Sequence, residues 1–183
     1  MLRLILISAA LALCLTAVGA TLAAAKRPAR PHTFQVAGTQ RVIDSDAGTY
    51  TMTGGLRGAW QTTSFEQVSL SPYYEGKGTE SFKGCIDRRR DRSCQGDPSG
   101  TLTFTFRYWA IYGSADPASL VWGACWHPVV SGTGAFAGAQ GVVTMVDSPT
   151  TAGVKTRYVG SLTLRGGSSS RKAQARAARV PHC

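Results

Sequence analysis

A strict two-residue alternation of apolar and polar side chains is the feature that most constrains what this chain can fold into. Between Thr101 and Tyr108 every second residue is large and apolar, and the residues between them are Thr or Arg. In a β-strand successive side chains point to opposite faces, so this segment predicts a strand with one packed face and one solvated face. The packed face consists of Leu102, Phe104, Phe106 and Tyr108.

Strand patterns also dominate the rest of the chain. No window of a dozen residues before the C-terminal tail keeps the apolar period of a helix. Seven more strands are expected, at 34–43, 50–53, 56–70 (with a bend at Gly58), 73–86, 120–130, 141–146 and 154–164. Turn compositions separate them at 46–48, 71–72, 96–100, 113–117 and 148–153.

Short connections between successive strands predict an antiparallel meander. An open meander would expose two strand edges, so a chain of this size closes it into a barrel or folds it into a sandwich. The 21 glycines favour the barrel, because strongly bent strands need residues without a Cβ. The expected fold class is all-β, a single antiparallel eight-stranded barrel of calycin type with disordered N- and C-terminal tails.

The first 25 residues have the order of a secretory signal peptide. Arg3 precedes an apolar run, and small residues follow at 20–25. Cleavage is expected after Ala25, with Ala20 as the second candidate. The alternative is an uncleaved membrane anchor over 4–25, which would place the basic residues Lys26, Arg27 and Arg30 on the wrong side of the membrane. The sequence therefore predicts a secreted protein that is not an integral membrane protein after cleavage.

Four segments follow along the chain: a signal peptide (1–25), a basic linker (26–32), one β-barrel domain (33–165) and a disordered basic tail (166–183).

The formal net charge is +10, but between Pro31 and Gly166 there are 12 basic and 10 acidic residues. A nearly neutral body is unlike a dedicated nucleic-acid surface. The basic ends are interpreted as solvated tails, with weak contact to anionic envelope polymers as the alternative. Their charges are Lys26, Arg27, Arg30, Arg171, Lys172, Arg176 and Arg179.

Cysteine usage agrees with export. Cys14 would leave with the signal peptide, and the four that remain are Cys85, Cys94, Cys125 and Cys183. An even number in an exported chain predicts disulfides. Cys85 with Cys94 is the favoured pair, because these residues bracket a short polar loop. The alternative pairs either of them with Cys125. Three states are open for Cys183: free, bonded to Cys125, or linked to another molecule. The spacing does not suit zinc.

One glycine-rich segment resembles a family signature. Residues 132–141, Gly-Thr-Gly-Ala-Phe-Ala-Gly-Ala-Gln-Gly, are similar to the Gly-Thr-Gly-x-Phe-x-x-Ala-x-Gly motif of dirigent proteins and of the allene oxide cyclase barrel-like superfamily. The segments 76–84 and 158–164 support the resemblance, which covers about residues 50–164. It implies a secreted, bacterial-type member with a calycin-type barrel that can hold one small apolar ligand. Gly132 and Gly134 would take positive φ around Thr133, and Phe136 would plug the barrel end.

The same resemblance gives expectations about activity but no catalytic residue. Members of the superfamily isomerise an unstable fatty-acid epoxide or orient phenoxy radicals without oxidising them. The matching stretch is the glycine corner and not the pocket, so no catalytic residue is carried over. Fold alone does not determine activity.

Aromatic side chains on the expected strands could line a lumen pocket. Filling of the core is the alternative for each of them taken alone. The candidates for ligand lining are Trp60, Phe104, Phe106, Tyr108, Trp122 and Trp126.

Acid–base candidates are few. His127 is the one histidine expected in the ordered body, and because Pro128 follows it, a corner position is the favoured interpretation. Glu66, Glu75 and Glu80 fall on expected strands, where a carboxylate turned into an apolar lumen would have a raised pKa. Glu80 and His127 are retained as weak catalytic candidates. No hydrolase motif and no metal-ligand cluster accompanies them, so neither a cofactor nor a metal is expected.

Three functional hypotheses follow. The first is an exported, non-catalytic barrel that binds or shields a small hydrophobic ligand, and a solidly packed lumen would contradict it. The second is a cofactor-free isomerase or cyclase, which requires Glu80 and His127 to face one cavity. The third is an envelope-interaction protein held by its basic ends.

Overall fold

The computed structural model of the chain describes residues 30–70, 73–114 and 119–165. The expected signal peptide, most of the basic linker, the C-terminal tail and Cys183 lie outside the described residues. Within the described part of the chain, no helix has the length and apolar character needed to cross a membrane.

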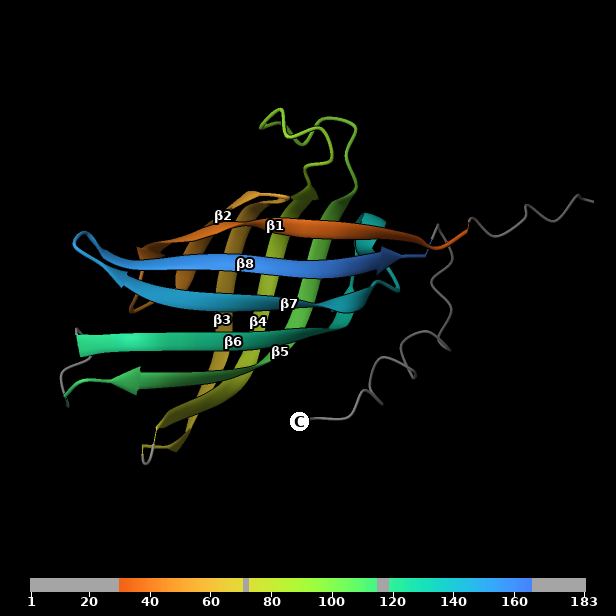
Figure 1. Cartoon of the computed structure of the whole chain (residues 1–183). Coiled ribbons are helices and arrows are strands. Elements are labelled where there is room, and N and C mark those ends of the chain that lie inside the picture. The colour runs from red at the N-terminus through yellow and green to blue at the C-terminus, as the bar shows by residue number, and fades with distance from the viewer. Residues whose placement is uncertain (1–29, 71–72, 115–118, 166–183) are drawn as a thin grey trace, which may run out of the picture.

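Eight strands form one closed antiparallel barrel in which each strand pairs with its neighbour in sequence and β1 pairs with β8 (Figure 1). The expected all-β, eight-stranded meander barrel is therefore confirmed. The strands are β1 (His32–Asp44), β2 (Thr49–Gly54), β3 (Leu56–Ser69), β4 (Tyr74–Ile86), β5 (Ser99–Tyr112), β6 (Leu120–Gly132), β7 (Gln140–Thr150) and β8 (Gly153–Leu164).

The strands β5 and β7 are longer than the sequence pattern predicted. The expected turn at 148–153 is shorter, because the antiparallel pairing continues through Pro149, which lies opposite Val154. Only the residues between Thr150 and Gly153 remain for the turn. This extension brings Asp147 into β7, where its side chain reaches the lumen.

The lumen is filled with side chains over one half of the barrel, at what we call the packed end. The fully buried residues Trp60 and Phe104 stack with ring centroids 4.6 Å apart, and Phe82 lies 6.3 Å from Phe136. Leu102 and Leu162 are also fully buried in this cluster. This dense packing supplies the apolar burial that stabilises the fold.

The glycine corner closes the packed end. Thr133 precedes a short 3-10 helix, Gly134–Phe136, and the Phe136 side chain is completely buried, as expected of a plug. Gly134 has a φ of +61°, which favours glycine. The expectation of positive φ at Gly132 is wrong, since Gly132 lies at the end of β6 and a Cβ there would approach the carbonyl oxygen of Phe136 to 2.2 Å.

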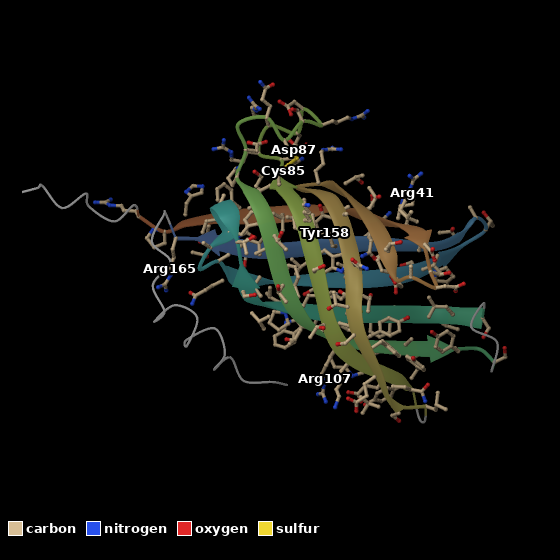
Figure 2. The ribbon with its side chains drawn as sticks, turned by 180° about the vertical axis from the view of Figure 1, so that it is seen from behind. Arg41, Cys85, Asp87, Arg107, Tyr158 and Arg165 are labelled. Carbon is tan, nitrogen blue, oxygen red and sulfur yellow. A yellow bond between two sulfur atoms is a disulfide. The ribbon has the colours of Figure 1, made fainter. Side chains whose placement is uncertain are left out.

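Tyr158 connects β8 with β2 and β3 from inside the barrel (Figure 2). Its hydroxyl oxygen accepts a 2.7 Å hydrogen bond from the Leu56 N–H and donates toward the carbonyl oxygen of Thr53 at 3.0 Å. Burial raises the pKa of Tyr158 to about 12, so the hydroxyl remains protonated and able to donate.

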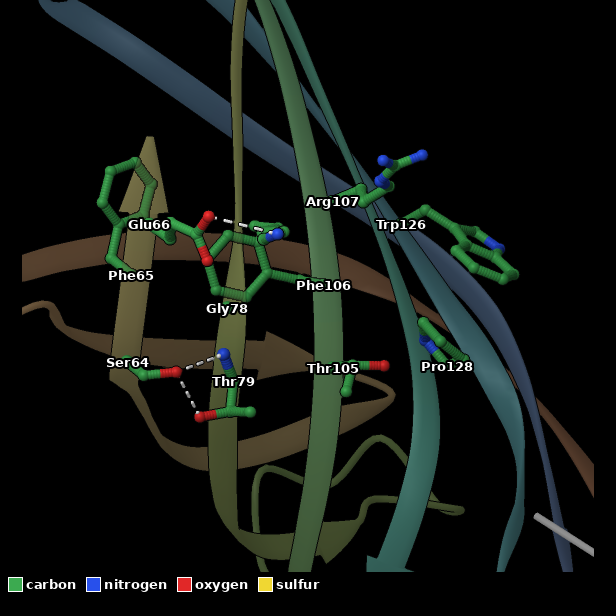
Figure 3. A pocket seen from close by; sticks show the side chains of 11 residues that line it. Ser64, Phe65, Glu66, Gly78, Thr79, Thr105, Phe106, Arg107, Trp126 and Pro128 are labelled. Atoms are coloured by element: carbon green, nitrogen blue, oxygen red, sulfur yellow. Dashed lines mark hydrogen bonds and ion pairs between the residues drawn. The ribbon is translucent and has the colours of Figure 1, made fainter. Parts of the chain in front are cut away.

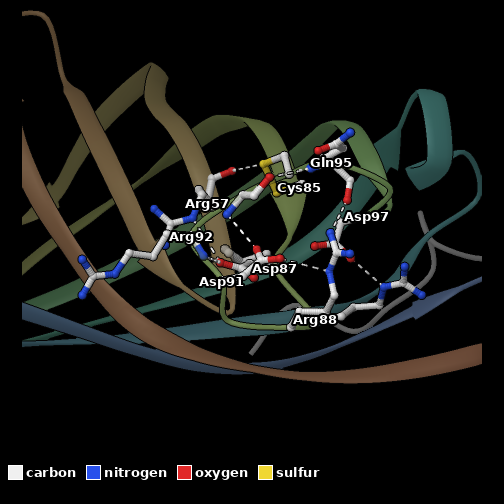
Figure 4. Close-up of a disulfide and its surroundings, with 12 residues drawn as sticks. Arg57, Cys85, Asp87, Arg88, Asp91, Arg92, Gln95 and Asp97 are labelled. Carbon is white, nitrogen blue, oxygen red and sulfur yellow. Dashed lines mark hydrogen bonds and ion pairs between the residues drawn. A yellow bond between two sulfur atoms is a disulfide. The ribbon is translucent and has the colours of Figure 1, made fainter.

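The loop after β4 is held by a disulfide. Cys85 and Cys94 are bonded, which confirms the favoured pairing, and the alternative pairings of these residues with Cys125 are wrong because Cys125 is a free thiol. Figure 4 shows acidic side chains of this loop meeting arginines: Asp87 accepts a 3.2 Å bond from Arg57, and Asp97 a 2.8 Å bond from Arg88. The disulfide is compatible with an extracytoplasmic location.

Candidate ligand-binding site

A cavity of about 300 Å³ occupies the other half of the lumen, and we call it the lumen cavity. Every strand contributes to its wall, and it reaches exposed side chains at the barrel end formed by the β1–β2 and β7–β8 turns. It is lined by Gln40, Val42, Tyr50, Thr62, Phe65, Glu80, Phe106, Tyr108, Cys125, His127, Met145, Asp147, Val154 and Thr156. A cavity of this size is at the lower limit of small-molecule sites.

Large apolar side chains remain exposed around this end of the barrel. We call them the apolar rim; they are Val42, Ile43, Val68, Leu70, Tyr73, Ile111, Val121, Trp122 and Val154. Apolar side chains gathered in this way typically mark an interaction or ligand site.

Glu80 lies between the lumen cavity and the packed end. Its Oε2 accepts hydrogen bonds from Trp60 Nε1 at 2.7 Å and His127 Nε2 at 2.9 Å, and its Oε1 accepts one from Thr62 at 2.9 Å. Burial opposes the negative charge, but the bonds from His127, Trp60 and Thr62 outweigh it, so the pKa of Glu80 lies below its ordinary value. Glu80 is therefore a buried, ionised carboxylate.

Both nitrogens of His127 are occupied. Nδ1 lies 3.1 Å from the carbonyl oxygen of Val143, which can only accept, so Nδ1 carries a proton. Nε2 lies 2.9 Å from Glu80 Oε2. Both nitrogens therefore have partners within the protein, and neither is free to take a proton from a ligand.

Asp147 is the second carboxylate of the lumen cavity. Its Oδ1 accepts a 2.5 Å hydrogen bond from Thr156. Burial raises the pKa of Asp147 above its ordinary value, although Thr156, the His127 charge and Tyr108 partly oppose this effect. The cavity thus has two carboxylates whose pKa values move in opposite directions.

Comparisons with known proteins do not connect this cavity with an established site. Models of protein families, curated proteins and solved structures give no match to the chain. Among the described residues, no group of three or more His, Cys, Asp or Glu side chains is arranged to hold a metal ion.

The two weak catalytic candidates lie together in the lumen. The expectation that His127 occupies a corner is wrong: it lies within β6, and only 1% of it is exposed. Pro128 does not end the strand, because β6 continues to pair with β5 beyond it, at Val129. The carboxylates of Glu66 and Glu75 instead form ion pairs with Lys77 and Arg107.

The aromatic candidates divide into three groups. Phe106 and Tyr108 line the lumen cavity as expected. Trp60 and Phe104 do not, because they are fully buried in the packed half. Trp122 and Trp126 do not line it either, since they alternate along β6 with the cavity residues Cys125 and His127 and therefore point outward.

The sequence analysis did not single out several cavity residues. Phe65 faces the lumen because β3 has an irregular register between Thr62 and Ser64, which moves the inward face from even to odd positions. Asp147 was missed because the expected strand ended at Val146. The alternation of Val143, Met145 and Asp147 was the signal that could have found it.

A larger groove of about 730 Å³ crosses strands β3 to β6 and shares only Phe65 and Phe106 with the lumen cavity (Figure 3). Its charged side chains have partners within the protein. Lys77 lies 3.2 Å from Glu66, and Arg107 lies 3.3 Å from Glu75. The buried, charged groups of the lumen cavity make it the stronger candidate site.

Proposed function

We propose that this protein binds a small, largely apolar molecule in the lumen cavity. The observation that carries the proposal is the division of the barrel: one half of the lumen is packed, while the other keeps a cavity of about 300 Å³. Structural stability alone would favour filling such a space, because unfilled volume in a core lowers the free energy of unfolding.

The lining supports an apolar ligand with a polar group. Phe65, Phe106 and Met145 offer apolar surface, and Glu80 and Asp147 offer a few fixed polar atoms. This combination is typical of small-molecule sites. The apolar rim surrounds the same end of the barrel and suits the entry of an apolar molecule.

We also propose that the protein acts outside the cytoplasm, after removal of the signal peptide at Ala25, and is a distant member of the allene oxide cyclase barrel-like superfamily. The disulfide, the closed eight-stranded barrel and the buried Phe136 plug support these proposals. Envelope contact through the basic ends depends mainly on residues outside the described part of the chain.

Native mass spectrometry of the mature protein from its own host tests ligand binding. We expect a bound molecule that organic extraction removes. Val154→Trp should abolish this bound mass, because Val154 lines the cavity. The control Val159→Trp, on the same strand but outside the cavity lining, should retain it. A bound mass that survives Val154→Trp would place the ligand elsewhere and refute the proposal.

Cofactor-free isomerisation is the second candidate function, because Glu80 and Asp147 have oppositely shifted pKa values in one cavity. Glu80 would take a proton from a carbon of the ligand, and protonated Asp147 would supply one to another atom. Solvent deuterium should then enter the extracted ligand in the presence of the protein but not of Glu80→Gln. Equal incorporation with Glu80→Gln would remove this candidate.

A further inference from the structure

We infer that the lumen cavity selects an organic amine, protonated at neutral pH, and rejects a carboxylate ligand of the same size. This inference rests on the proposed lumen-binding function and specifies the chemical class of the ligand. It starts from the two carboxylates of the cavity wall, Glu80 and Asp147, which in the ionised form can only accept hydrogen bonds.

Two carboxylates supply these acceptors. Glu80 receives three hydrogen bonds, from Trp60, Thr62 and His127, out of the roughly four that a carboxylate can accept. Asp147 is hydrogen-bonded by Thr156 and Tyr108, so it keeps the greater remaining capacity. An N–H group of a ligand would find acceptors on both sides of the cavity.

Positive charge in the wall does not balance these carboxylates. Among the described residues that line the cavity, His127 is the one side chain able to carry a positive charge, and both of its nitrogens are committed to Glu80 and Val143. On β8, the cavity residues Val154 and Thr156 alternate with Lys155 and Arg157, which therefore point outward. With both carboxylates ionised, the lining has more negative than positive charge in either protonation state of His127.

Aromatic faces add to the preference for a cation. Four rings line the cavity, from Tyr50, Phe65, Phe106 and Tyr108. Phe65 and Phe106 stack with centroids 6.2 Å apart. Aromatic faces attract ammonium groups, and this attraction is stronger where water is displaced.

A ligand carboxylate would meet the opposite conditions. It would lie near Glu80 and Asp147 without a lysine or arginine in the described lining to neutralise it. Burying a charge without a partner is costly. The cavity therefore discriminates by charge, while its apolar surface accepts the body of the ligand.

Three probes with similar skeletons test this inference: 2-phenylethylamine, 2-phenylethanol and 3-phenylpropanoate. Isothermal titration calorimetry of the mature protein at pH 7 should show the amine binding about tenfold tighter than the alcohol, and the propanoate weakest. Asp147→Asn should bring the amine within about threefold of the alcohol. The control Glu66→Gln removes an outer carboxylate, 66% exposed, and should leave the tenfold preference unchanged.

The outcomes separate the two proposals. An alcohol or propanoate that binds as tightly as the amine, and loses binding in Val154→Trp, would overturn the amine inference and leave lumen binding intact. An amine preference that persists in Asp147→Asn would also overturn it. Binding of no probe, or binding that Val154→Trp does not weaken, would overturn lumen binding together with the amine inference.

Discussion

The Glu80 carboxylate accepts hydrogen bonds from three side chains, among them that of buried His127. Glu80→Gln should therefore lower the free energy of unfolding by about 3–5 kcal/mol, because it removes one partner of a buried, hydrogen-bonded His–carboxylate pair. Urea denaturation measures this change. Glu66→Gln is the matched control: its pair with Lys77 is exposed and should contribute less than about 1 kcal/mol. Similar losses in both variants would contradict the structural importance of the buried pair.

Stability should depend on pH through the two lumen carboxylates in opposite directions. The lowered pKa of Glu80 means that its contribution is present above its unfolded pKa of about 4.3 and is lost as pH falls through the folded value. The raised pKa of Asp147 means that its charge destabilises the fold as pH rises through that raised value. Asp147→Asn should therefore increase the free energy of unfolding at pH 7, measured by urea denaturation. A less stable Asp147→Asn variant at pH 7 would contradict this assignment.

The residue scale also shows which parts of the site were predictable. Phe106 lies on a strand with regular alternation, so its inward position followed from the pattern. The pattern did not assign a face to Glu80, because carboxylates on a strand more often point into solvent. Phe65 follows a register irregularity, which changes the face of the residues from Ser64 to the second irregularity after Gln67 and has no clear signature in one sequence. The contact between Glu80 and His127 depends on the register of β4, β5 and β6 around the barrel, which alternation within single strands does not specify.

At the scale of elements, the Cys85–Cys94 disulfide closes a short loop between β4 and β5. The two cysteines are nine residues apart, and loss of this closure should lower the free energy of unfolding by roughly 2–3 kcal/mol in the Cys85→Ser/Cys94→Ser variant. Chemical denaturation with and without reductant measures the effect. Reductant should destabilise the wild type but not the variant, and Cys125→Ser should keep the wild-type response. A variant as stable as the reductant-free wild type would show that the loop needs no covalent closure.

Element boundaries were predicted least well where turn-forming residues extend a strand. Ser148 and Pro149 are typical of turns, yet both pair with β8. Local composition describes the preference of an isolated segment, whereas the ladder adds stabilisation from a neighbouring strand. Asp147 was consequently left between the expected strand, which ended at Val146, and the expected turn, which began at Ser148.

At the scale of the whole molecule, barrel closure places the two ends of the described chain side by side. His32 of β1 lies opposite Leu164 of β8. A circular permutant that joins Arg165 to Arg30 by a short linker and opens between Asp46 and Ala47 should fold, because the new ends lie in an exposed turn. Its cost should be less than about 2 kcal/mol, measured by thermal and urea unfolding with near-ultraviolet circular dichroism as the test of packing.

A matched permutant that opens inside β4, between Ser81 and Phe82, should fail to fold, because both residues pair with β3 and β5. Equal folding of the two permutants would contradict the importance of the continuous ladder. The barrel itself was predictable, since eight alternating segments with short turns have few arrangements in which the backbone N–H and C=O groups of the edge strands find partners. The half-filled lumen was not, because it depends on which side chains share a layer once all eight strands are in register.

The packed half of the lumen has a kinetic consequence. The side chains between Trp60 and Phe136 block passage along the barrel axis, so a molecule in the cavity has to leave toward the end by which it entered. A second ligand therefore cannot enter through the packed end and displace the first from that side. In stopped-flow displacement, the observed release rate should therefore reach a plateau equal to the dissociation rate of the first ligand, whatever the concentration of the second. The residence time of a bound ligand would thus depend on the dissociation rate of that ligand and not on the concentration of a competitor.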